Sequence, residues 1–326
     1  MSKPLAIWQF LLDRLQQNAS VMLLYVLESS GSSPGRQGFF MAVSADGQME
    51  GSIGGGVMEH KFVEMAKDKL KQRIEEHSVR KQIHDKAAAK NQSGMICSGE
   101  QTILLYTLGR ENLPTIQSII ECLQQSKNGC LQLSPAGLSF QPGLIPQNDF
   151  HYNFNSENDW MYEEKIGFKN HLYIVGGGHC ALAFSRIMNM MDFYIHLFDD
   201  RKGLNTFDQN LYVHEKTIVT DYSELKDLIP SGDHCYVVVM TFGYRTDDTA
   251  VRALLNKEFA YFGLLGSATK IAKMFSDYRQ EGIEETYLKK IYAPIGLPIH
   301  SQTPEEISIS IAAEIIQVKN KYSAKA

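Results

Sequence analysis

The sequence has little of what a membrane-bound or secreted protein needs. Among its 326 residues, no apolar run approaches the roughly 20 residues of a membrane-spanning helix. The segment from Met1 to Trp8 lacks the apolar core and the small-residue cleavage site of a secretory signal. The cysteines are odd in number and include no CxxC pair, which argues against a disulfide framework of the secreted kind; they are Cys97, Cys122, Cys130, Cys180 and Cys235. These absences predict a cytoplasmic protein with reduced thiols.

The sequence also lacks a basic excess. Lysine and arginine together number 32 and aspartate and glutamate 37, which leaves a formal net charge of −5. A nucleic-acid surface needs positive charge to replace the counterions on phosphates, so small molecules and proteins are the expected partners. Hydrophobic residues make up 44% of the chain and charged residues 21%, as in globular proteins. The length predicts two domains with separate cores.

The first part of the chain mixes helical and strand patterns and predicts an α+β domain over residues 1–110. Its first apolar side chains fall on one face at helical spacing, and Ala45-Asp46-Gly47 is typical of a hairpin turn. The expected elements are a helix at 5–18, strands at 21–27, at 38–43 and directly after 47, a helix at 57–76, and strands at 81–84 and 101–108.

The pattern weakens between residues 111 and 165. Residues 113–125 have a helical pattern, but 127–160 contain short strand-like pieces with proline, asparagine and aspartate and no strong periodicity. We interpret 111–165 as an extension and linker. From residue 166 to 326 apolar runs alternate with glycine clusters and helical segments, which predicts βαβ units and a parallel sheet, and so an α/β class for this domain.

A glycine-rich loop opens the second domain. Residues 171–175 form a buried strand pattern, and Gly176, Gly178 and Ala181 then match G-x-G-x-x-A. In this Rossmann-like fingerprint the first glycine permits the tight turn, the second lets a phosphate approach the backbone, and the alanine lets the helix pack closely on the strand. The amides at the start of the predicted helix 180–190 then face the anion. A turn that only packs helix on strand is the alternative.

Further residues around this loop are candidate binding residues. Asp199 follows Gly178 by 21 residues, at the end of the next predicted strand, where the fingerprint expects a carboxylate for ribose hydroxyls. Gly177 and His179 lie within the loop, and a helix N-terminus disfavours protonation of His179. Arg201 is placed either to contact a phosphate or to form a surface ion pair. No acid, base and hydride-orienting set follows, as a dehydrogenase would require.

Two later segments add polar residues at predicted strand ends. Residues 236–240 read as a buried strand and lead to Thr241 and Asp247, at the edge where open α/β sheets bind ligands. Gly266 and Ser267 precede the predicted helix 268–280, whose start carries Lys270. This arrangement is either an anion site or a capped helix with a solvated lysine. Residues 303–306 form a capping box before the helix 307–318, with a structural role.

A second glycine cluster lies in the first domain. Gly54, Gly55 and Gly56 precede a predicted helix and form a candidate anion cradle, with Arg36 on the preceding loop positioned to lean over it. The alternative is a tight strand-to-helix turn with a solvated Glu59. Glu59 and His60 lack a third ligand at a known spacing, so a metal site there is not expected.

These motifs, in this order, resemble the XdhC/CoxI family across nearly the whole chain. The matching pieces in the first part are Ser32-Ser-Pro-Gly-Arg36, Gly51-Ser-Ile-Gly-Gly-Gly-Val-Met-Glu59 and Met95-Ile-Cys-Ser-Gly99. Those in the second part are Ile174-Val-Gly-Gly-Gly-His179, Asp199-Asp-Arg201, Thr241-Phe-Gly-Tyr244 with Asp247, Gly263-Leu-Leu-Gly-Ser267 with Lys270, Pro294-Ile-Gly-Leu297 and Thr303-Pro-Glu-Glu-Ile307.

The resemblance implies a cytoplasmic cofactor chaperone that is non-catalytic or weakly catalytic. Such proteins bind the molybdenum cofactor, as molybdopterin or its dinucleotide form, and shelter it while a cysteine desulfurase installs the terminal sulfur. They then help deliver it to the apo-form of a xanthine dehydrogenase-type hydroxylase, and they are expected to be homodimers. In this chain the cofactor phosphate or pyrophosphate is expected on Gly176 to Ala181, with molybdenum facing Cys97 across the domain interface.

Cys97 is the residue to which the resemblance gives molybdenum contact or sulfur relay, because a thiolate is a soft ligand and a nucleophile. The usual Cys-Gly-Gly of the family is here Cys97-Ser98-Gly99, which keeps the thiol but reduces backbone freedom at the middle position. Without the resemblance, a single cysteine beside a strand is more often a small buried hydrophobe. Two alternatives to the chaperone remain: an NAD(P)-dependent oxidoreductase using the same fingerprint, and a scaffold that docks hydroxylase to desulfurase.

Overall fold

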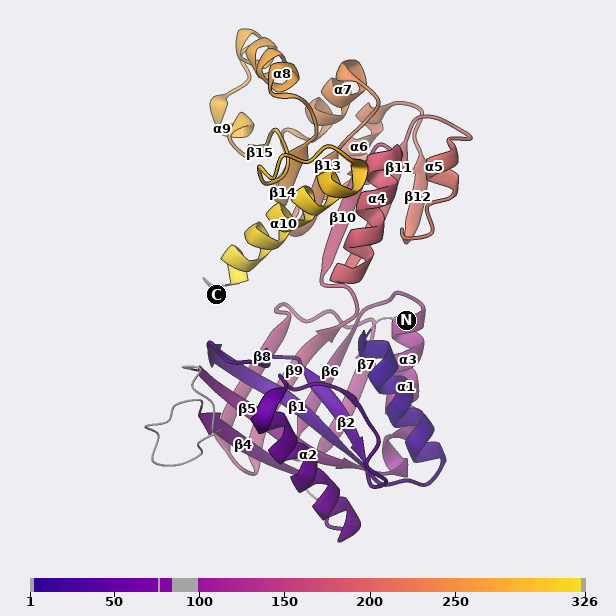
Figure 1. Cartoon of the computed structure of the whole chain (residues 1–326), viewed down its shortest axis with the longest axis vertical. Coiled ribbons are helices and arrows are strands. Elements are labelled where there is room, and N and C mark those ends of the chain that lie inside the picture. Colours follow the sequence, from indigo (N-terminus) through magenta and orange to yellow (C-terminus); the bar gives the residue numbers. More distant parts are fainter. Residues whose placement is uncertain (1–2, 76, 84–98, 324–326) are drawn as a thin grey trace. The chain divides into compact units, whose positions relative to one another are not determined.

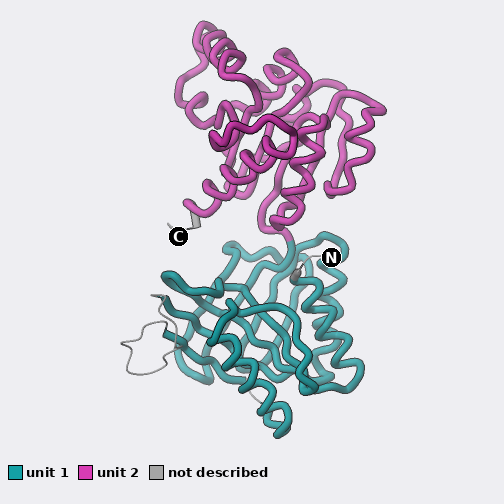
Figure 2. Tube along the Cα trace, viewed as in Figure 1, with its two compact units in different colours: residues 1–167 teal, residues 168–326 magenta. Residues whose placement is uncertain are grey.

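The computed structural model describes residues 3–75, 77–83 and 99–323, and the chain divides into two compact units, Met1–Gly167 and Phe168–Ala326 (Figure 2). The first unit is built on two antiparallel sheets and the second on one parallel sheet (Figure 1). Within the described ranges, no helix combines the length and the apolar character needed to cross a membrane.

The first sheet of the first unit has the strand order β3-β2-β1-β5-β4, and its central strand is buried on both faces. Met22, Leu24 and Val26 point towards the helix α2, whereas Leu23 and Tyr25 point to the opposite face. The seven consecutive apolar residues at the start of β1 follow from this double burial. The elements are β1 (Val21–Gly31), β2 (Phe40–Ser44), β3 (Met49–Gly51), α2 (Gly56–Lys71), β4 (His77–Ile83) and β5 (Gly99–Leu108).

The second sheet of the first unit, ordered β7-β6-β9-β8, is built from the segment that the sequence assigns to an extension and linker. Apolar side chains of this segment, among them Ile116, Leu131 and Trp160, share one core with Trp8 and Leu23. Residues 111–165 therefore pack as part of the first compact unit. The elements are α1 (Lys3–Gln16), η1 (Arg110–Asn112), α3 (Leu113–Gln124), β6 (Gly129–Ser134), β7 (Gly137–Pro142), β8 (Phe150–Ser156) and β9 (Asp159–Ile166).

A buried carboxylate joins the two sheets of the first unit. Glu164 on β9 accepts hydrogen bonds at Oε2 from the hydroxyls of Tyr25 on β1, at 2.6 Å, and of Tyr162, at 2.7 Å. Burial, and then the negative charge of Glu164, raise the pKa of Tyr25 well above its usual value. Both tyrosines therefore stay protonated and keep donating to the carboxylate.

The second unit is a six-stranded sheet of order β12-β11-β10-β13-β14-β15, with every pair parallel. Counted along this unit the order is 3-2-1-4-5-6, the arrangement of dinucleotide-binding folds. The predicted α/β class and Rossmann-like parallel sheet are confirmed. The strands are β10 (Asn170–Val175), β11 (Phe193–Asp199), β12 (Glu215–Ile218), β13 (Gly232–Val239), β14 (Phe259–Leu264) and β15 (Ile291–Tyr292).

Helices cover both faces of this sheet (Figure 1). Leu172 and Ile174 face α4 and α10, which pack along each other, and Tyr173 and Val175 face the layer with α7 and α8. This double cover explains the continuous apolar run of β10. The helices are α4 (His179–Met188), η2 (Asn189–Met191), α5 (Asn205–Asp208), η3 (Tyr222–Glu224), α6 (Leu225–Leu228), α7 (Tyr244–Leu254), α8 (Ala268–Gln280), α9 (Glu285–Leu288) and α10 (Pro304–Ser323).

Histidines line the amino-terminal half of this sheet. His171 Nδ1 lies 3.1 Å from His196 Nε2, and His196 Nδ1 lies 3.0 Å from Glu215 Oε2. His214 Nδ1 accepts a hydrogen bond from the Ile195 amide at 2.9 Å, which requires the neutral ring. Burial lowers the pKa of His196, against the opposing effect of Glu215, and burial with the neighbouring His196 lowers the pKa of His214.

These lowered pKa values predict that the second unit loses stability on mild acidification. The folded pKa lies below the unfolded value of about 6.5, so the unfolded chain binds more protons between the two values. The stabilisation is therefore complete above about pH 6.5 and is lost as the pH falls through that window. Thermal unfolding at pH 7.5 and 5.5 checks this; His214→Asn, which keeps an acceptor that does not titrate, should lose less. Equal or greater wild-type stability at pH 5.5 contradicts it.

Candidate functional site

The predicted binding residues of the second unit lie at or after the carboxyl ends of the strands of its sheet. They lie at or just beyond the ends of four neighbouring strands, β11, β10, β13 and β14, around the point where the strand order reverses. Open α/β sheets bind ligands at such a point. The residues brought to this edge are Gly176, Gly177, Gly178, His179, Ala181, Asp199, Arg201, Thr241, Asp247, Gly266, Ser267 and Lys270.

The glycine loop after β10 has one position that only glycine fills and one that is open. Gly176 has φ 108°, and a Cβ there would lie 2.7 Å from the Met240 carbonyl carbon and 2.8 Å from the Thr241 Cα. Gly178 precedes the first residue of α4 with φ −72°, and a Cβ there meets nothing within 4 Å. The open space lies before the first turn of α4, where helix amides lack intrahelical partners.

Two further loop residues differ in exposure. Ala181 is 1% exposed and packs in the core beneath α4, as the fingerprint expects of its third position. His179 is the first residue of α4 and has an exposed side chain. The loop thus has a side packed towards the sheet and a side open to solvent.

Asp199 is fully buried and is saturated by donors of its own chain. Its Oδ1 accepts from the Arg201 amide at 2.8 Å and from Arg201 Nε at 2.9 Å. Its Oδ2 accepts from the Gly177 amide at 2.6 Å and from Arg201 Nη2 at 2.8 Å. Burial alone raises the pKa of Asp199, but the bonds from Arg201 and Gly177 outweigh it and hold the pKa below its usual range. A ribose hydroxyl would have to displace one of these donors.

Arg201 is held by two guanidinium hydrogen bonds to Asp199 and lies over a neighbouring aromatic ring. Its guanidinium carbon lies 5.5 Å from the ring centroid of Phe242. Phe242 directly follows Thr241 and is 86% exposed. Of the two alternatives for Arg201, a surface ion pair and a phosphate contact, the structure contains an ion pair with a buried partner.

The loops after β13 and β14 are joined by a second buried carboxylate. Asp247 Oδ1 accepts from the Thr241 amide at 3.0 Å and from Thr241 Oγ1 at 2.6 Å, and its Oδ2 pairs with Lys270 Nζ. Lys270 Nζ also donates to the Leu265 carbonyl at 3.2 Å. Lys270 is therefore an ion-pair partner with a partly exposed side chain rather than a solvated lysine.

Ser267 caps α8, because its Oγ accepts from the Lys270 amide at 3.2 Å. Gly266 lies against the Lys270 side chain, with its Cβ position 3.0 Å from Cδ. The capped-helix alternative for this segment is thus present in the structure.

Sequence reasoning missed three side chains that shape this edge. Thr206 Oγ1 donates to the Gly177 carbonyl at 2.6 Å, and the ring of Phe207 lies against Gly177. Phe242 lies inside a motif of the family, yet its residue type alone does not mark it as a binding residue. Thr206 and Phe207 carry no local signal, because their role comes from the path of the chain after β11.

The candidate anion cradle in the first unit binds a carboxylate of its own chain, that of Glu59. Gly54, Gly55 and Gly56 all have positive φ, but Glu59 Oε2 accepts hydrogen bonds from the amides of Ile53 and Gly55, each at 2.9 Å. The Ser52 hydroxyl donates to the same oxygen at 2.7 Å. Of the glycine amides, that of Gly55 is engaged by Glu59 and that of Gly54 donates to Ser52 Oγ at 3.1 Å, so Glu59 is more than a solvated first-turn residue.

Arg36 is exposed and donates to the Gly31 carbonyl at 3.0 Å. Its loop does lie against the glycines, since a Cβ on Gly54 would be 2.8 Å from the Pro34 carbonyl carbon. Gln101 Nε2 donates to the carbonyls of Gly35 and Ile53, each at 3.1 Å, and thereby ties the two loops together.

The motif pieces of the first unit meet at this place. A Cβ on Gly99, the last residue of the third piece, would lie 2.7 Å from the Ser33 amide nitrogen in the first piece. Cys97, with Ser98, lies outside the described residues. The described residues contain no group of three or more histidine, cysteine or acidic side chains arranged for a metal ion.

Removing the Glu59 carboxylate should destabilise the first unit. Glu59→Ala leaves two partly buried amides and a hydroxyl without their acceptor, which costs about 1–3 kcal/mol. Urea unfolding measures the loss. Glu64→Ala, on the exposed side of the same helix, is the matched control and should change little. Equal stability of the two variants would show that the Glu59 contacts do not hold the loop.

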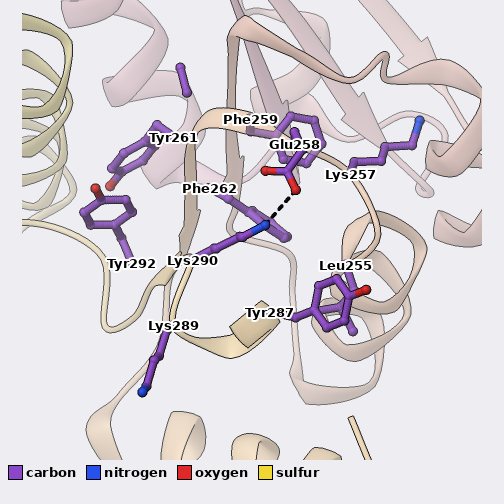
Figure 3. A pocket seen from close by; sticks show the side chains of 11 residues that line it. Leu255, Lys257, Glu258, Phe259, Tyr261, Phe262, Tyr287, Lys289, Lys290 and Tyr292 are labelled. Carbon is purple, nitrogen blue, oxygen red and sulfur yellow. Dashed lines mark hydrogen bonds and ion pairs between the residues drawn. The ribbon is translucent and has the colours of Figure 1, made fainter. Parts of the chain in front are cut away.

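A hollow of about 310 Å³ lies at the opposite edge of the second unit, before β14 and β15 (Figure 3). Lys290 pairs there with Glu258 at 2.6 Å, Lys257 donates to the Ile229 carbonyl, and the rings of Tyr261 and Tyr292 stack at 4.6 Å. Lys289 points away from Lys290 and Glu258 (Figure 3). None of the predicted binding residues lines it.

Comparison with known families matches both units. The family model for the XdhC Rossmann domain matches residues 172–315, and that of the XdhC and CoxI family matches residues 14–79. The chain belongs to the XdhC/CoxI family. The matched ranges contain the carboxyl-edge residues, Arg36 and the Gly54–Gly56 loop, whereas Cys97 lies between them.

Curated relatives and one solved structure agree with this membership. The uncharacterized protein YqeB of Escherichia coli K12 is 25% identical over 313 residues, 94% of this chain and 44% of that protein. A protein of Bacillus subtilis named as a probable subunit of xanthine dehydrogenase is 27% identical over 164 residues, 50% of this chain and 47% of that protein. The chain spans less than half the length of either relative.

The solved structure is described as a xanthine dehydrogenase from Bacillus halodurans. It matches with a TM-score of 0.67 at 21% identity, covering 98% of this chain and 96% of that one. This likeness establishes a shared fold over both units.

Proposed function

We propose that this XdhC/CoxI family member is a maturation factor for a xanthine dehydrogenase-type molybdenum hydroxylase. It binds the molybdenum cofactor as cargo, holds it while a cysteine desulfurase adds the terminal sulfur, and delivers it to the apo-enzyme. The observation that carries the proposal is the open space at Gly178 before the first turn of α4, next to a Gly176 position that admits no side chain.

The cargo suits this edge because it carries a phosphate in its molybdopterin form and a pyrophosphate in its dinucleotide form. The amides at the start of α4 offer hydrogen bonds and a positive helix end to such an anion. The partly exposed side chains of Arg201 and Lys270 add positive charge to the same edge. In the proposal these groups hold the phosphate, and Cys97 contacts molybdenum or relays sulfur.

An NAD(P)-dependent oxidoreductase is the second candidate. The strand order 3-2-1-4-5-6 and the glycine loop favour a dinucleotide. The saturation of both Asp199 oxygens removes the ribose contact that such enzymes use. We therefore rank this function below cofactor delivery.

Reconstitution separates the two candidates. Purified full-length chain is mixed with molybdenum cofactor, then with apo-hydroxylase and desulfurase, and bound molybdenum and hydroxylase activity are measured. We expect one cofactor per chain and activation of the hydroxylase, both lost in Cys97→Ala and kept in the control Cys122→Ala, whose thiol is buried on α3. Nicotinamide turnover without cofactor uptake, unaffected by Cys97→Ala, would support the oxidoreductase and contradict the proposal.

We also propose, on the basis of family membership, that the chain forms a homodimer. The molecular mass of the purified chain in solution, from light scattering, tests it. A monomer at micromolar concentration contradicts this part alone.

A further inference from the structure

Phe242 presents a large apolar ring to solvent from a rigid position. Its side chain is 86% exposed, and it closely follows β13. The residue before it is fixed by the bonds from Thr241 to Asp247, and the Gly243 amide after it donates to Thr246 Oγ1 at 3.2 Å. Because the backbone is held on both sides, the ring projects from a defined point of the carboxyl edge.

The guanidinium of Arg201 lies over this ring and is itself held in place by hydrogen bonds. Two of its guanidinium nitrogens, Nε and Nη2, bond Asp199, and Asp199 also accepts from the Gly177 amide. The glycine loop, Arg201 and Phe242 thus form one connected unit. In the described part of the chain, the third guanidinium nitrogen, Nη1, makes no hydrogen bond with another group.

The backbone that precedes this ring packs against the glycine loop, and the ring is linked to the same loop through Arg201 and Asp199. A Cβ on Gly176 would lie 2.8 Å from the Cα of Thr241, the residue before Phe242. A ligand with its phosphate on the amides of α4 therefore has an exposed aromatic face beside it. Flat aromatic and heteroaromatic rings stack on such faces, and stacking tolerates different rings because every base has a π-face.

We propose that Phe242 and Arg201 form a stacking shelf for the flat nitrogen heterocycle of a phosphate-bearing ligand. The inference builds on the proposed function and adds the chemistry that selects the ligand at the same edge. Ring stacking on Phe242 and a contact to Arg201 Nη1 replace the ribose contact that the saturated Asp199 does not offer. The heterocycle is either a nucleobase or a pterin, since both present a flat ring joined to phosphate.

Binding of three probes to the full-length chain tests the shelf. ADP carries a nucleobase, dihydroneopterin triphosphate carries a pterin, and ribose 5-phosphate carries the phosphate without a ring. Phe242→Ala should weaken the binding of ADP or of the pterin probe about tenfold and leave ribose 5-phosphate unchanged. Phe242→Trp should retain ring binding. Phe39→Ala, at an exposed phenylalanine of the first unit, is the matched control and should bind all three as wild type does.

The probe that loses more affinity in Phe242→Ala identifies the ring. The shelf is overturned if wild type and Phe242→Ala bind the ring probes equally, or if wild type binds neither ring probe. The maturation function would then still be tested separately by reconstitution. If Phe242→Ala loses ring binding but the wild-type chain does not activate the hydroxylase, the result supports the shelf and contradicts the proposed function. Unfolding temperatures of the variants exclude a folding defect.

Discussion

Gly176→Ala is expected to lower the free energy of unfolding of the second unit by about 3 kcal/mol. Gly176 has φ 108°, which costs a residue with a Cβ about 1–3 kcal/mol. The new methyl group would also stand 2.7 Å from the Met240 carbonyl carbon, and backbone atoms directly after the central strand β13 have little room to move. Chemical denaturation followed by circular dichroism measures the loss.

Gly203→Ala separates the two causes of this destabilisation. Gly203 has φ 70° but nothing within 4 Å of its Cβ position, so only the backbone strain applies there. We expect a loss of about 1 kcal/mol. If Gly176→Ala is no more destabilising than Gly203→Ala, the close approach of the glycine loop to β13 is not as described.

Gly178→Asp is expected to fold as wild type does and to lose cofactor binding. The position has an ordinary φ of −72° and open space around its Cβ, and aspartate is a favourable residue before a helix. The carboxylate would occupy the start of α4 and repel the phosphate of a ligand. Molybdenum bound per chain and the unfolding temperature, measured on the same sample, check both parts.

Gly178→Ser is the matched variant for this position. Serine also precedes helices well but adds no charge and little volume, so it should keep most cofactor binding. An aspartate variant that binds molybdenum as wild type does would place the cofactor away from α4. An aspartate variant that unfolds early would show that Gly178 is needed for the fold.

The Rossmann unit was predictable because its signals are local. The buried run before Gly176, the spacing to Gly178 and Ala181, and the carboxylate at Asp199 all lie within one βαβ segment. The confirmed parallel sheet follows from that segment and its repeats. The strand order 3-2-1-4-5-6 required the structure, because pairing between distant strands leaves no local pattern.

The roles of individual side chains were less predictable, for a physical reason. Asp199 was expected to meet a ribose, but its saturation depends on the side-chain conformation of Arg201, two residues later. The sequence predicts a solvated Glu59 as the alternative to an anion site, whereas the positive φ values of the glycines direct loop amides onto its carboxylate. Both outcomes arise from short-range geometry that residue type alone does not specify.

In segment 111–165 the sequence did not reveal a whole sheet. Its strands are six to eight residues long, and because most of β8 is exposed, burial imposes little alternation on that strand. Among the apolar residues of its strands, Leu131, Leu133, Trp160 and Tyr162 enter the core deeply enough to mark a buried face.

A native mass spectrum of the full-length chain tests the central claim most directly. The chain is mixed with molybdenum cofactor released from a mature molybdenum enzyme, with NAD⁺ and NADP⁺ present as competitors, beside Gly178→Asp. The expected spectrum contains one molybdenum cofactor per wild-type chain and none on the variant. Two results would contradict the claim that this chain holds the molybdenum cofactor on its glycine loop. In one, wild type carries only a nicotinamide dinucleotide; in the other, wild type and the variant carry molybdenum cofactor equally.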